Sequence, residues 1–125
     1  IQQIVLPDFD VNNFEQPVDR VDRCTSCHMG IDKPDFADAE QPWTAHPDID
    51  PLLTKHPPEK FGCTSCHDGQ GVALNSIHQA HGEVRFWLQP LLKGEQMQSR
   101  CINCHRDVEM LPSAQNLAEG EYLFE

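Results

Sequence analysis

The sequence predicts a small, mostly irregular all-α fold of short helices, with little or no β-structure, organised around bound groups. Three observations predict this class. The chain has 125 residues, enough for one compact domain, but only 38% of them are hydrophobic. Ten prolines and seven glycines interrupt long regular elements. All six cysteines fall into three short patterns spread along the chain, so a thin protein core would pack against whatever the cysteines hold.

Each cysteine pair has the form Cys-X-X-Cys-His, and the three patterns span residues 24–28, 63–67 and 101–105. This spacing is typical of c-type haem attachment, because two thiols form thioethers on one edge of a haem and the histidine binds its iron. The sequence therefore predicts three covalently bound haem c groups. The attachment residues are Cys24, Cys27, Cys63, Cys66, Cys101 and Cys104, and the proximal iron ligands are His28, His67 and His105.

Two other chemistries use paired cysteines. Two Cys-X-X-Cys pairs can form a four-cysteine zinc site, but the third pair would then be left over. Six cysteines in a small exported chain can also form three disulfides. Neither chemistry explains why a histidine follows every pair, so haem attachment is the favoured interpretation.

Three irons need three further ligands if each is six-coordinate. Met29 directly follows a proximal histidine and cannot reach the far face of its own haem. Met97 and Met110 are more typical of packing residues. Ligation of every iron by two histidines is the economical interpretation, and it implies low reduction potentials. Four histidines lie outside the motifs: His46, His56, His78 and His81.

His46 and His56 each precede a proline, which favours an extended and stiff backbone. Such a loop can hold an imidazole over an iron at little entropic cost. His78 and His81 lie three residues apart and would share one face of a helix. From the residues alone, either of these two can be the surplus histidine, and the assignment of distal histidines to haems stays open.

The remaining secondary structure is predicted from the positions of proline and asparagine residues, which interrupt helices and strands. Pro7, Asn12 and Pro17 predict an extended N-terminal arm over residues 1–18. Six prolines between residues 30 and 60 predict a long loop. No strand is expected. Helices are expected over 18–28, 83–88, 95–105 and from about 113 to the end.

Short motifs also surround the three cysteine patterns between about residues 20 and 111. They resemble those of triheme modules in multihaem c-type cytochromes of metal-respiring and related anaerobic bacteria. The resemblance implies His46, His56 and His81 as distal ligands and leaves His78 outside the pattern. The matching motifs are Asp22-Arg23-Cys24 through Gly30-Ile31-Asp32, Gln41-Pro42-Trp43 with His46-Pro47, His56-Pro57, Phe61-Gly62-Cys63, Asp68-Gly69-Gln70-Gly71, Ala80-His81-Gly82, and Trp87 with Pro90-Leu91.

The charge balance narrows the partners. The chain carries 9 Lys and Arg against 20 Asp and Glu, a net charge of −11. That argues against nucleic acid and against anionic lipid, both of which need a basic surface. No apolar run approaches the length of a membrane span, so no direct insertion is expected in this segment. The expected partners are other redox proteins that carry a basic docking patch.

These features together predict an electron carrier rather than an enzyme. The alternative is a haem enzyme that reduces a small oxyanion, which would need one iron with an open distal position. Because bacteria attach haem c outside the cytoplasmic membrane, we expect a periplasmic location, with any tether to the inner membrane outside this segment.

The predicted domains are an N-terminal arm over 1–18, a triheme cytochrome domain over 19–111 and a C-terminal helix over 112–125. That last helix is similar to the opening helix of a monohaem cytochrome c domain. Triheme modules of the family that the chain resembles sit in larger periplasmic or membrane-anchored proteins. The resemblance therefore implies that the chain is part of a larger cytochrome.

Overall fold

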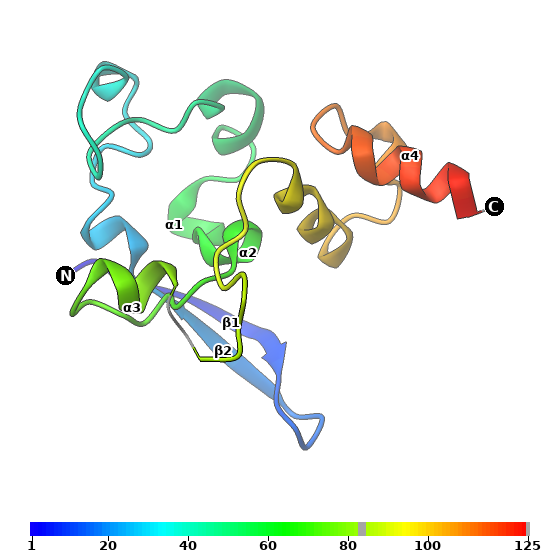
Figure 1. The fold of residues 1–125 in the computed structure, drawn as a ribbon, viewed down its shortest axis with the longest axis horizontal. Coiled ribbons are helices and arrows are strands. Elements are labelled where there is room, and N and C mark those ends of the chain that lie inside the picture. The colour runs from blue at the N-terminus through cyan, green and yellow to red at the C-terminus, as the bar shows by residue number, and fades with distance from the viewer. Residues whose placement is uncertain (83–84, 125) are drawn as a thin grey trace.

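The computed structural model describes residues 1–82 and 85–124. A hairpin projects from one side, and short helical turns joined by long loops make up the rest (Figure 1). The elements, with 3₁₀ and π turns labelled η, are β1 (Ile4–Val11), β2 (Pro17–Asp22), η1 (Cys24–Ser26), η2 (Pro34–Phe36), η3 (Ile49–Leu53), α1 (Pro58–Phe61), α2 (Thr64–His67), α3 (Ile77–His81), η4 (Gly94–Asn103), η5 (Val108–Met110) and α4 (Gln115–Phe124).

The N-terminal hairpin corrects the predicted fold class. Strands β1 and β2 pair antiparallel, with Ile4 opposite Asp22 at one end and Val11 opposite Pro17 at the other. The fold is therefore mixed and irregular, and the expectation of an all-α fold with little or no β-structure was wrong. Residues 1–18 are most of this hairpin instead of an extended arm.

Side-chain chemistry explains why these residues form a hairpin. The Oδ1 atom of Asn12 accepts hydrogen bonds from the backbone N–H groups of Phe14 and Gln16, which closes the turn. Pro7 and Pro17 do not break the strands, because both strands of a two-stranded sheet are edge strands and tolerate proline. The helix expected over 18–28 is absent, since β2 continues to Asp22 and the first motif follows at once.

Two more expected helices differ in the structure. The helix expected over 95–105 is the 3₁₀ segment η4, which begins at Gly94 and ends at Asn103. Of the helix expected over 83–88, residues 83 and 84 lie outside the described residues, and residues 85–88 are irregular. The C-terminal helix α4 begins at Gln115, two residues after the expected start.

The protein core is very small. Among the described residues, the buried apolar side chains are those of Leu6, Pro58, Pro90, Val108 and Ala114. Phe14 and Phe86 are 83% and 89% exposed. The chain exposes 9341 Å² in all, whereas a folded monomer of 14.2 kDa exposes roughly 6,800 Å². Protein atoms alone therefore leave a large apolar surface uncovered. In the described part of the chain, no helix has the length and apolar character needed to cross a membrane.

Candidate metal centres

The three cysteine motifs share one backbone hydrogen bond. In each motif the N–H of the histidine donates to the carbonyl oxygen of the first cysteine, at 3.0, 2.9 and 2.8 Å in chain order. One closed helical turn puts residues i, i+3 and i+4 on the same face. Both thiols and the imidazole of a motif thus project from one side of its turn.

The exposure of the cysteines also repeats. The first cysteine of each motif is half-buried and the second is exposed. All six cysteines are described, and each has a free thiol. The disulfide alternative raised by the sequence therefore finds no support in the structure.

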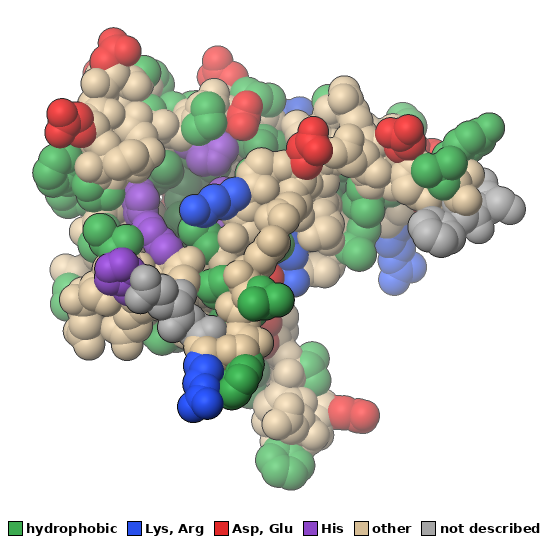
Figure 2. Space-filling view, viewed as in Figure 1, with side chains coloured by type: hydrophobic (Ala, Val, Ile, Leu, Met, Phe, Trp, Pro, Cys, Tyr) green, Lys and Arg blue, Asp and Glu red, His purple; other side chains and the backbone are tan. Residues whose placement is uncertain are grey.

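Each motif histidine faces a different one of the remaining histidines. Figure 2 shows histidine side chains in the hollowed left half of the face in view. The three predicted distal ligands are the ones brought opposite the motifs. The pairs, with the distances between their ring centroids, are His28 with His81 at 5.8 Å, His67 with His46 at 6.2 Å, and His105 with His56 at 5.9 Å.

These separations fit a metal ion held between two imidazoles. A metal–nitrogen bond of about 2 Å on each side, plus about 1 Å from each nitrogen to its ring centre, puts the centroids roughly 6 Å apart. Ordinary aromatic contacts cover about 4.5–7 Å, so the distance alone does not separate the two cases. The one-to-one pairing is stronger support for metal binding, because each of the three motif histidines is paired with a different histidine from outside the motifs.

The pairing is crossed along the chain. His81 follows the second motif but faces the first, while His46 and His56 precede the second motif and face the second and third. A group held by each pair would tie distant segments together. His78 lies on α3 beside His81, is exposed, and belongs to none of the three pairs. That the paired rings bind iron stays a prediction.

The surroundings of two rings favour the form that binds metal. Burial, reinforced by the neighbouring His81, holds the pKa of His28 below its ordinary value. Burial and the neighbouring His67 likewise lower the pKa of His46. A neutral imidazole can offer a lone pair to a metal, and the lowered pKa values favour the neutral form of both rings at neutral pH.

Backbone groups orient several of the rings through Nδ1. His67 donates from Nδ1 to the carbonyl oxygen of Leu92, and His56 donates to that of Leu52, each at 3.1 Å. Such bonds leave Nε2 as the free lone pair. His46 differs, because its Nδ1 accepts the N–H of Asp48 at 3.1 Å. For Nε2 of His46 to bind a metal, this hydrogen bond must be given up or the ring must lose its remaining proton.

A hollow beside one pair provides room for a ligand. It has a volume of about 500 Å³ and is bordered by His46. Its walls include the apolar side chains of Pro34, Pro47, Ile49 and Pro51 and the polar side chains of Gln41, Thr44 and Asp50, so the lining is mixed, with more apolar than polar surface. The loop that sequence analysis expected over 30–60 supplies these residues.

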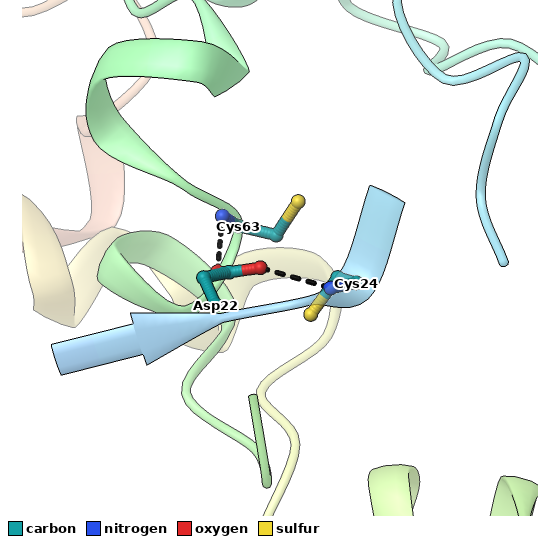
Figure 3. A group of neighbouring side chains, drawn as sticks. All are labelled: Asp22, Cys24 and Cys63. Atoms are coloured by element: carbon teal, nitrogen blue, oxygen red, sulfur yellow. Dashed lines mark hydrogen bonds between the residues drawn. The ribbon is translucent and has the colours of Figure 1, made fainter. Parts of the chain in front are cut away.

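A second cluster joins the first two motifs. Oxygen and sulfur atoms of Asp22, Cys24 and Cys63 lie within 4.8 Å of one another (Figure 3). Sequence reasoning missed the role of Asp22, which it noted only as part of a motif. The available signal was an acidic residue two positions before a cysteine motif, which is weak because 20 acidic residues are present.

This cluster is poorly suited to zinc. A structural zinc site takes four ligands, and the group contains three among the described residues. The Asp22 carboxylate already accepts three backbone hydrogen bonds. Hydrogen bonding to Cys63, burial and the charge of Asp22 all raise the pKa of the Cys24 thiol, which disfavours the thiolate that zinc binds.

The carboxyl group of Asp22 itself stays ionised at neutral pH. Burial acts to raise its pKa, but hydrogen bonds from the N–H groups of Thr64, Cys24 and Cys63 outweigh burial, and the pKa is lowered. A charged carboxylate therefore lies between the first two motifs.

Comparison of the chain with models of known protein families, with curated proteins and with solved structures found no match. The functional conclusion therefore depends on the motifs and their geometry.

Proposed function

We propose that this chain is an electron-transfer module that holds three covalently attached haem c groups, each between two histidines. The observation that carries the proposal is the one-to-one pairing of the three motif histidines with three other histidines. When bound, haem c supplies one-electron redox chemistry. The residues proposed to hold the groups are Cys24, Cys27, His28 and His81 for the first, Cys63, Cys66, His67 and His46 for the second, and Cys101, Cys104, His105 and His56 for the third.

Adjacent positions of the motifs support a carrier. The thiols of Cys24 and Cys63 lie within 4.8 Å of each other, so the first motif is next to the second. Helix α2, which carries most of the second motif, packs against η4, which carries the start of the third, so these two motifs are also neighbours. Arg100 beside the third motif pairs with Asp68 beside the second, at 3.2 Å. The second motif therefore lies between the other two, in the contiguous order that electron transfer requires.

Two histidines at each metal position favour a carrier over a catalyst. An iron with six ligands has no position left for a substrate. Reduction of a small oxyanion, the alternative, needs one of the three distal imidazoles to be absent or to move aside. The pairing of all three motif histidines argues for the carrier.

The uncovered surface is a second support. The chain exposes 9341 Å², and three large flat apolar groups would cover part of what the small core leaves open. With a net charge of −11, the proposed partners are redox proteins that present a basic patch. Because bacteria attach haem c outside the cytoplasmic membrane, we also propose that the chain works in the periplasm within a larger cytochrome.

Mass spectrometry of the denatured protein tests the proposal. The chain would be produced in bacteria with the haem-attachment machinery, and the mass should exceed that of the polypeptide by three haems. A Cys101→Ala, Cys104→Ala double variant is the matched control and should carry two. A colourless product, or pigment that is removed by acidified acetone, would contradict the proposal.

Carbon monoxide separates the carrier from the enzyme. The spectrum of the reduced protein should be that of low-spin haem and should not change when the gas is added. A spectral shift that affects one haem in three would instead indicate an open distal position.

A further inference from the structure

We propose that Asp22 is a positioning residue that fixes the separation of the first two haem-attachment motifs. The inference rests on the proposed function, since it concerns where two of the three haems are held. It assigns a role to a residue that neither binds iron nor forms a thioether.

The contacts of Asp22 reach both motifs. Its Oδ1 atom accepts the N–H of Cys24 at 3.0 Å, and its Oδ2 atom accepts the N–H groups of Cys63 and Thr64 at 2.7 Å each. Figure 3 shows the carboxylate between the first cysteines of the two motifs. Its side chain is fully buried, with 0% exposure, and is the largest such side chain in the described part of the chain. Hydrogen bonds to a buried carboxylate are short and strong, so this link is rigid.

The Asp22 link brings distant parts of the chain together at the proposed haem-attachment atoms. Cys63 lies 41 residues after Asp22, whereas Cys24 lies two residues after it. The thiols of Cys24 and Cys63, where two haem edges would be attached, lie in one cluster with the carboxylate. A change in the Asp22 link therefore changes the relative position of the two attachment points.

Glycines next to the second motif allow this close approach. A Cβ atom on Gly62 would lie 2.8 Å from Oδ2 of Asp22, and one on Gly71 would lie 2.6 Å from the carbonyl oxygen of Val21. Gly62 also has a φ of +63°, a conformation that other residues rarely adopt. The backbone N–H of Arg23 donates to the carbonyl oxygen of Gly71 at 2.8 Å, which makes a second link beside the carboxylate.

Only a carboxylate satisfies all three donors. An amide has one acceptor oxygen and one NH₂ group. In an Asp22→Asn variant, the oxygen can accept from one motif only, and the NH₂ group then faces the backbone N–H of the other motif, a donor against a donor. The variant keeps the size of the side chain but loses the link to one motif. It should shift one attachment turn relative to the other without removing any ligand.

The experiment compares the haem-loaded protein with its Asp22→Asn variant. Mass spectrometry should find three haems in both. The circular dichroism of the Soret band measures coupling between neighbouring haems, which depends on the distance and the angle between them. The amplitude of its paired positive and negative lobes should change by at least about twofold, because functional sites depend on sub-ångström positioning. Asp19→Asn is the matched control. Asp19 lies on the same strand, is exposed and, among the described residues, accepts only the N–H of Asp8. Its spectrum should equal that of the unchanged protein.

The outcomes separate the two proposals. An unchanged chain with fewer than three haems would overturn the proposed function. Three haems together with an unaltered Soret signal in Asp22→Asn would overturn only the role of Asp22, because a residue that merely stabilises the fold lowers the unfolding midpoint and leaves this signal intact.

A measurement on the unchanged protein covers the case in which the variant does not fold. In the fully reduced, diamagnetic state, the amides of Cys24, Cys63 and Thr64 should exchange with solvent as slowly as the most protected amides. Fast exchange at these amides would overturn the inference.

Discussion

At the scale of single residues, the proposed ligation at the first motif depends on a choice between two histidines on one short helix. His81 and His78 lie three residues apart on α3, yet the ring of His81 is the one that lies 5.8 Å from His28. His81 is the last residue of α3, and Gly82 is its C-cap. The resemblance to known cytochromes implied the same histidine.

Replacing these two histidines should give different spectra. His81→Ala should convert one haem in three from low to high spin, because an iron that loses one imidazole becomes five-coordinate or takes water. His78→Ala, on the same helix, is the control and should stay low spin throughout. Electron paramagnetic resonance of the oxidised protein distinguishes the two states. A high-spin signal from His78→Ala alone would reverse the assignment.

Local and long-range features differed in how far they could be predicted. Each cysteine motif closes its own helical turn through the hydrogen bond from its histidine to its first cysteine. Five adjacent residues are therefore enough to predict its geometry. The pairing of His105 with His56 joins residues far apart in sequence, and no spacing rule fixes it. Asp22 was overlooked for the same reason, since its partners Cys63 and Thr64 lie on a different segment.

At the scale of elements, the hairpin was not predicted because proline and asparagine have different effects in a central strand, in an edge strand and in a turn. Pro7 and Pro17 argue against a central strand, but a two-stranded sheet has no central strand. Asn12 suggested a break and instead makes the turn that pairs the strands. The hairpin contributes to the candidate site, because its second strand ends at Asp22, which contacts the first and second cysteine motifs.

Arg20 holds the hairpin on the second motif. It donates two hydrogen bonds to the carboxylate of Asp10, at 2.8 and 2.6 Å, and a third to the carbonyl oxygen of Thr64 at 2.8 Å. Arg20→Ala should lower the free energy of unfolding by about 1–3 kcal/mol, the cost of leaving part-buried partners unpaired. Denaturant unfolding of the haem-loaded protein measures this value.

A surface ion pair provides the control for Arg20. Lys33 lies 3.1 Å from Asp32 with both side chains more than half exposed. Lys33→Ala should change stability by less than about 1 kcal/mol, since water screens exposed pairs. Equal losses in the two variants would mean that Arg20 does not anchor the hairpin.

At the scale of the whole molecule, the small core predicts that folding depends on the groups that the cysteines are proposed to hold. The buried apolar side chains in the described part of the chain are too few to offset the entropy of ordering a chain of this length; they are Leu6, Pro58, Pro90, Val108 and Ala114. A ligand that binds only the folded state stabilises it. We therefore expect that the chain produced without haem attachment is largely unfolded, with poorly dispersed amide proton signals in its NMR spectrum. A dispersed spectrum and cooperative unfolding of this haem-free chain would contradict the expectation.

The charge of the whole molecule makes a separate prediction about its redox partners. With a net charge of −11, long-range attraction should speed its encounter with a basic protein, and salt should weaken that attraction once the Debye length falls to about 10 Å near 0.1 M. Stopped-flow electron exchange with a basic monohaem cytochrome c should therefore slow by about tenfold or more as salt is raised from millimolar to molar concentrations. Exchange with an acidic flavodoxin is the control, and it should quicken over the same range because salt screens repulsion. A rate with the basic partner that is independent of salt would mean that the acidic residues serve solubility and do not guide docking.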